Sequence, residues 1–130
     1  MGWETFTAAN PNKSSVGDGQ CLFTKTITNG VLKAGATFQY SPSAASPPPN
    51  PTTLFTTAAD IPLSNNVYPI PDSSLPTSFN IPPKGAFSGG NYTTMTGATY
   101  NPTTNTLQGT FNDDPAGDDD DCDWSASGGS

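Results

Sequence analysis

The stretch CLFTKTITNGVLKAGATFQY at residues 21–40 decides the fold. Asn29-Gly30, at its centre, supplies the two positive-φ residues that a type I′ turn requires. We therefore expect a β-hairpin in which Thr28 faces Val31, and the pairing of both strands follows by counting outward from the turn.

The same count sorts the side chains of this hairpin onto two faces, because successive residues of a strand point to opposite sides of the sheet. One face is apolar and is interrupted only by Lys25, while the other is mainly threonine. The apolar face collects Cys21, Phe23, Ile27, Leu32, Ala34, Ala36 and Phe38. A single turn thus predicts two antiparallel strands with one buried face.

Residues 87–112 predict a second hairpin, whose connection at 101–105 has the Pro and Asn typical of a longer loop. Its expected core anchors are Tyr100, Leu107 and Phe111. No stretch of ten or more residues shows helical periodicity with caps, so helix should be nearly absent. The sequence predicts an all-β fold, a small antiparallel β-sandwich or barrel.

Three further segments differ in composition from the hairpins. Residues 1–20 are polar and rich in breakers, and we interpret them as an extended N-terminal arm. Within the β domain at 21–112, residues 41–84 hold eleven of the fourteen prolines, which forbids helix interiors and central strands. Apolar residues recur through this segment, so we expect a strap lying on an apolar surface. Residues 113–130 form an acidic C-terminal tail.

Two residue types that commonly build active sites and anion clamps, histidine and arginine, are missing from the chain. Hydrolytic and transfer reactions usually need a positioned base, most often His, so we expect no enzymatic activity. Nucleic acids and anionic membranes are bound through clustered Lys and Arg. With four lysines in 130 residues, neither partner is expected.

The whole net charge of −7 lies at the C-terminal end. Residues 1–112 carry four lysines and four acidic residues, whereas the tail holds seven aspartates and no base. A solvated acidic tail that keeps a neutral body soluble is the simplest interpretation. The alternative is a calcium site, because carboxylate-dense loops supply the oxygens that calcium takes. Its candidate ligands are Asn112, Asp114, Asp118, Asp120 and Asp123, and no other cofactor is expected.

Two cysteines, Cys21 and Cys122, are too few for a thiolate metal site. They are either two thiols of a reducing compartment, an intrachain disulfide that clasps the tail to the first hairpin, or a disulfide between subunits. The spacing leaves all three interpretations open.

Aromatic residues scattered along the extended segments are the candidate contacts with a partner. Tryptophan and tyrosine are favoured in interfaces and cores, and their ring faces can also stack on sugars. The residues that we expect to contact an assembly are Trp3, Phe6, Phe55, Tyr68 and Trp124.

The opening Glu4-Thr5-Phe6-Thr7, followed by an arm rich in Asn, Pro, Ser and Gly and then a β domain, resembles the small head-decoration proteins of tailed phages. The resemblance covers about twenty residues, and the proline strap, the cysteines and the acidic tail depart from it. It implies a non-enzymatic cement protein, often trimeric, whose arm docks on the capsid lattice and reinforces it.

The thin core and the apolar anchors spaced along extended chain favour a structural protein of a virion or another extracellular assembly. We expect a protein lattice or further copies of the chain as partners. Two alternatives stay open: a carbohydrate-binding or adhesive β-sandwich, and a calcium-binding β module.

Overall fold

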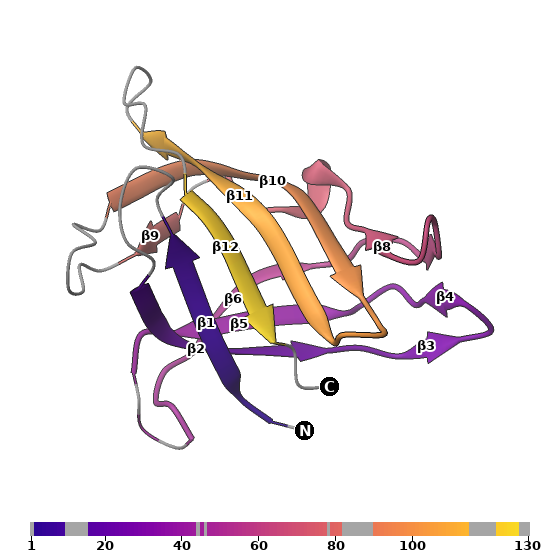
Figure 1. Cartoon of the computed structure of the whole chain (residues 1–130), viewed down its shortest axis with the longest axis horizontal. Helices are drawn as coiled ribbons and strands as arrows, with labels where there is room; N and C mark the ends of the chain where they lie inside the picture. The colour runs from indigo at the N-terminus through magenta and orange to yellow at the C-terminus, as the bar shows by residue number, and fades with distance from the viewer. Residues whose placement is uncertain are drawn as a thin grey trace.

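The computed structural model confirms the all-β fold (Figure 1). Within the described residues, nine antiparallel strands form one curled sheet, and a smaller sheet of three strands extends from it. The only helical element described is a single 3-10 turn. The structure describes residues 2–9, 16–43, 45, 47–77, 79–81, 90–114 and 122–127.

The large sheet has the strand order β6-β5-β2-β1-β12-β11-β10-β8, and β9 also pairs with β10. The small sheet has the order β3-β4-β7. The elements are β1 (Glu4–Ala9), β2 (Val16–Thr24), β3 (Ile27–Thr28), β4 (Val31–Leu32), β5 (Thr37–Ser41), β6 (Thr52–Thr56), β7 (Ile61–Pro62), β8 (Tyr68–Pro69), the 3-10 helix η1 (Asp72–Ser74), β9 (Phe79–Ile81), β10 (Gly90–Asn101), β11 (Thr106–Asp114) and β12 (Cys122–Ser127).

The predicted turn of the first hairpin is confirmed. Asn29 and Gly30 have φ angles of 52° and 73°, and Thr28 pairs with Val31 across them. Farther from the turn the pairing changes, because Phe23 lies opposite Phe38 rather than the predicted Ala36. The second arm of the hairpin therefore contains two more residues than the first, and the hairpin is split into the pairs β3-β4 and β2-β5.

The predicted apolar face of this hairpin survives the change of register, since a shift of two residues leaves every side chain on its original face. Its buried members are Cys21, Phe23, Leu32, Ala36 and Phe38. The prediction was wrong for Ile27 and Ala34, which are exposed. Ile27 lies in the short sheet that extends beyond the main sheet, where less of the core covers it (Figure 1).

Parts of the predicted arm and tail lie in the middle of the large sheet. Strand β1 pairs with β2 on one side and with β12 on the other. Strand β12, from the acidic tail, also pairs with β11. The described part of the N-terminal segment is extended, as expected, but the boundary at residue 20 does not separate an arm from the β domain. The boundary at residue 113 likewise falls inside β11.

The described part of the proline-rich strap lies on the protein's own core. It contributes the edge strands β6, β8 and β9, the short strand β7 and the helix η1. Its buried apolar side chains are Leu54, Phe55, Ile61, Tyr68, Ile70 and Leu75. Both Leu54 and Phe55 are buried although they are adjacent, because the register between β5 and β6 shifts at this point.

The second hairpin is confirmed as β10-β11, with the predicted connection between Asn101 and Thr106. Its register shifts twice, and both extra residues lie on β10, which makes two β-bulges. At the second bulge Gly97 has a φ of 65°. Since a bulge reverses the alternation, Met95 and Tyr100 both face the core despite their odd spacing. The side chain of the third predicted anchor, Phe111, lies outside the described residues.

The curl of the sheet brings the two hairpins face to face. Figure 1 shows β1 and β12 passing in front of β2 and β5. The Phe23 ring on β2 lies 5.0 Å from the Tyr100 ring on β10, centroid to centroid. Phe23 also lies 6.4 Å from each of the Phe38 and Phe55 rings, so it joins the two halves of the core. In the part of the chain described, no helix has the length and apolar character needed to cross a membrane.

Candidate functional site

Three of the five residues predicted to contact an assembly are core residues instead. Phe6, Phe55 and Tyr68 expose 0%, 4% and 2% of their surface. Phe6 packs edge-on against Tyr40 at a centroid distance of 4.8 Å, which explains why a residue of the presumed arm is inaccessible to a partner. Trp3 is half-buried. The side chain of Trp124 lies outside the described residues, and its backbone pairs with β1 and β11.

The core also contains Tyr40 and Tyr100, so these tyrosines offer no surface on which a sugar ring could stack. Together with Tyr68, three of the four tyrosines of the chain are therefore inaccessible to a sugar. Within the described residues, no geometric observation favours the carbohydrate-binding alternative.

Three of the five predicted calcium ligands lie near one end of the sheet. Asn112 and Asp114 lie at the end of β11, and Asp123 lies in β12, opposite Thr110. Asp118 and Asp120 lie outside the described residues. Among the residues that the structure describes, no group of three acidic, His or Cys side chains is placed to hold a metal ion. Calcium binding stays a prediction. We call residues 113–123, which contain all seven aspartates of the tail, the acidic end.

The register of β1 bears on the two cysteines. Cys21 lies beside Glu4, whereas Asp123, the neighbour of Cys122, lies beside Ala9. Five residue steps of a strand span ~17 Å, while the Cα atoms of a disulfide lie within ~7 Å of each other. An intrachain disulfide does not fit this register, and pairing between subunits stays a prediction.

The Cys21 thiol is fully buried, with its Sγ 3.6 Å from the carbonyl oxygen of Glu4. Burial, and secondly the charge of Glu4, raise the pKa of Cys21 to about 12. The thiol therefore stays protonated at neutral pH, which makes it a poor nucleophile.

A pocket of about 260 Å³ opens where the first hairpin changes register. The second arm of the hairpin has two extra residues. Because of them, the two arms separate between the pair β2-β5 and the pair β3-β4, which lies next to the turn. We call this cavity the lysine pocket. It is lined by Thr24, Lys25, Thr26, Lys33, Ala34, Gly35 and Ala36.

Lys25 lines one side of the lysine pocket. Its Nζ lies 5.0 Å from the centroid of the Tyr100 ring and 5.6 Å from that of Phe23, within the range of cation-π attraction. Burial lowers the pKa of Lys25. In the part of the chain described, Lys25 forms no ion pair with a carboxylate. Its ammonium group is thus partly desolvated and not neutralised.

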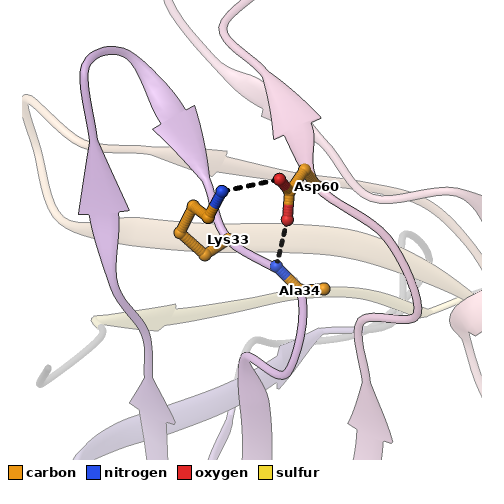
Figure 2. A network of polar contacts seen from close by, with 3 residues as sticks. All are labelled: Lys33, Ala34 and Asp60. Carbon is orange, nitrogen blue, oxygen red and sulfur yellow. Dashed lines mark hydrogen bonds and ion pairs between the residues drawn. The ribbon is translucent and has the colours of Figure 1, made fainter.

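Lys33, on the other side, is neutralised by Asp60, as Figure 2 shows. Its Nζ donates to Asp60 Oδ2 at 2.7 Å, and the Ala34 N–H donates to Asp60 Oδ1 at 2.8 Å. The hydrogen bond from Lys33, followed by that from Ala34, lowers the pKa of Asp60. Asp60 therefore fixes the second arm of the pocket and leaves Lys25 as its uncompensated charge.

Chemically, this arrangement can bind an anion. Thr24 and Thr26 also line the cavity, and a threonine hydroxyl is a hydrogen-bond donor. The sequence carried a signal for this site, since Lys25 was the single interruption of the apolar face. It carried none for the pocket itself, because the turn alone predicts continuous pairing.

A second candidate surface is the outer edge of β6, the last strand on its side of the sheet. Thr52, Thr53 and Thr56 are exposed along it, and the strand contains no charge and no proline. Thr57, the next residue, exchanges backbone hydrogen bonds with Ala36 and Gly35 on the inner side. By alternation, the N–H and C=O of Thr56 point outward, away from β5.

No protein family model matches the sequence, and comparison with curated proteins and with solved structures found no significant match.

Proposed function

We propose that the protein is a non-enzymatic structural component of a virion or another extracellular assembly, which it joins through its open sheet edge. A capsid decoration protein that stabilises a lattice is the specific form of this proposal. Further copies of the chain are the expected neighbours in the assembly, so the protein would act as a homo-oligomer.

Strand β6 has no partner on its outer edge among the described residues, and this observation carries the proposal. An edge strand presents a row of free backbone donors and acceptors, which can pair with a strand of another chain. Natural proteins that must stay monomeric protect such edges with charges, prolines or bulges that turn the edge away. Strand β6 has a bulge at Leu54, but its exposed residues are uncharged threonines. This composition favours pairing rather than protection.

The docking element differs from the one that the resemblance to phage decoration proteins implies. In that family the N-terminal arm would contact the lattice, but here β1 is committed on both sides to strands of its own chain. In the described part of the chain, β6 is paired on one side only, so its other side can take that role.

The test replaces Thr56 by proline, which removes its outward N–H without breaking the ladder between β5 and β6. Thr56→Val is the matched control, because it keeps the N–H and a β-branched side chain. Sedimentation velocity in ~0.5 M NaCl, where exposed charge pairs are largely screened, should show oligomers for wild type and Thr56→Val. Thr56→Pro should be monomeric with an unchanged circular dichroism spectrum. A monomeric wild type, or a proline variant that associates equally well, would contradict the proposal.

A further inference from the structure

We propose that the lysine pocket binds aspartate carboxylates of the acidic end of a second copy, so that copies associate head to tail. This inference rests on the proposed function, because it names a second contact by which the assembly is held together.

The lysine pocket has the chemistry of a carboxylate site. An ammonium group that has lost part of its water and lies over two aromatic rings gains most from a nearby anion, because the lower local dielectric strengthens the attraction. Lys25 is such a group, while the neighbouring Lys33 is already paired with Asp60. One carboxylate at Lys25 would complete the charge balance of the pocket.

The acidic end has the complementary composition. It carries seven aspartates and no base, whereas the rest of the chain is neutral in sum. Asp113 and Asp114 end β11, and Asp123 is the second residue of β12, so these three aspartates lie at one end of the sheet. Repulsion among these carboxylates is relieved when a cation approaches.

The acidic end cannot reach the lysine pocket of its own chain. Ala9 lies beside the acidic end, and Glu4 lies ~17 Å away from it along β1. Glu4 pairs with Cys21 of β2, and Lys25 lies ~13 Å beyond Cys21 in the same direction. The sum is ~30 Å. Seven residues separate the end of β11 from the start of β12, and a connection of that length can reach at most ~13 Å from its two ends. Figure 1 agrees, since the end of β11 and the hairpin β3-β4 lie at opposite ends of the molecule.

A contact between opposite ends of identical chains is heterologous. Such contacts form a closed ring where the rotation between copies closes, and an open filament where it does not. The lysine pocket and the acidic end each remain available at one terminus of every open chain of copies, so growth continues until closure. Edge pairing through β6 is a separate contact, on a different element.

The test is carried out at low ionic strength in the Thr56→Pro background, where association through β6 is removed. Two variants each lose one half of the contact. Lys25→Met keeps the apolar stem over the rings without the charge, and the second variant has Asp118, Asp119, Asp120 and Asp121 replaced by Asn. Lys25→Arg is the control, because it keeps a cation that stacks on aromatic rings.

In sedimentation velocity, the parent and Lys25→Arg should form a ladder of species that dissociates in ~0.5 M NaCl. Each defective variant alone should be monomeric. An equimolar mixture of the two should give a dimer and nothing larger, because Lys25→Met retains its acidic end and the Asn variant retains its pocket. Only one productive contact can then form. If Lys25→Met lacks the native circular dichroism spectrum, Lys25→Gln takes its place.

A Lys25→Met variant that associates like the parent overturns the inference, as does a mixture that stays monomeric. A parent that is monomeric at low salt also overturns it. In each case the contrast between Thr56→Pro and Thr56→Val at high salt still decides the proposed function. The two failures are therefore distinguishable.

Discussion

The two hairpins that face each other across the core differ in how the register between their strands changes. In the first hairpin the register changes by two residues at one place, and a pocket opens there. In the second it changes by one residue at two places, and β10 stays paired with β11 along most of its length. An even shift keeps each side chain on its face and separates the strands, whereas an odd shift reverses the faces and bends the strand.

This difference teaches where cavities open in a curled sheet. The bulges of β10 add curvature, which brings Tyr100 over Phe23 and closes the core. The interruption of the first hairpin adds no curvature of this kind but exposes a half-buried lysine at the border of that core. The bulges of β10 thus curve the sheet, whereas the interruption of the first hairpin gives access to Lys25.

The contact between the hairpins is tested most severely at Phe23, which is fully buried and lies against rings of both halves. Phe23→Ala should lower the free energy of unfolding by about 3–5 kcal/mol, because it removes buried area and leaves a cavity. Urea denaturation followed by tryptophan fluorescence measures this. Phe23→Leu, which keeps most of the volume, should lose clearly less. Equal losses for both variants would mean that Phe23 does not join the two halves.

A smaller loss of stability distinguishes the interruption of the first hairpin from the bulge of the second. Gly35 lines the lysine pocket with a φ of 92°, and Gly97 forms the β10 bulge with a φ of 65°. An added Cβ would meet no atom within 4 Å at either position, so only backbone strain is measured. Gly97→Ala should cost about 1 kcal/mol, since 65° lies within the left-handed region that L-residues tolerate. Gly35→Ala should cost more, because 92° lies outside it. Thermal unfolding of both variants checks the order, and the reverse order would contradict it.

The sequence predicted what depends on local chemistry and missed what depends on distant pairing. Asn29-Gly30 fixed the first turn because its requirement for positive φ is local. The core role of Phe6 was missed, since its strand is paired by β12 from the other end of the chain. No local sequence pattern indicates that β1 pairs with β12.

The candidate site shows the same division. Lys25 was visible as an anomaly on an apolar face, because alternation survives a shift of two residues. The pocket depends on Asp60, which holds Ala34 and Lys33 from 26 and 27 residues away. Asp60 is one of several aspartates in polar loops, and no local feature of the sequence distinguishes it.

Within the second hairpin, the Tyr100 hydroxyl donates to Asn105 Oδ1 in the connecting turn. Tyr100→Phe should lower the free energy of unfolding by about 1 kcal/mol, the usual net contribution of one such hydrogen bond. Tyr68→Phe is the matched control, because Tyr68 is equally buried and its hydroxyl has no hydrogen-bond partner among the described residues. That variant should be as stable as wild type. A loss of equal size in both would show that the ring environment, and not the turn, determines the effect.

The smallest expected effect lies at Lys25 and concerns pH. Burial lowers the pKa of Lys25 in the folded state, so the unfolded state binds more protons between the folded pKa and the ordinary value of 10.5. Stability conferred at this position is therefore least at neutral pH and rises as the pH approaches 10.5. Lys25→Met and Lys25→Arg lack this titration, since a guanidinium stays charged throughout.

Urea denaturation of wild type and both variants from about pH 8 to 10 measures the difference. The stability of wild type relative to each variant should increase with pH, while the two variants should run parallel. Titration of Tyr100, whose pKa is raised by burial and then by Tyr68, is common to all three proteins. Parallel curves for all three would mean that the ammonium of Lys25 is hydrated like a surface lysine. The first hairpin would then differ from the second in geometry only, without the desolvated charge on which the proposed carboxylate binding depends.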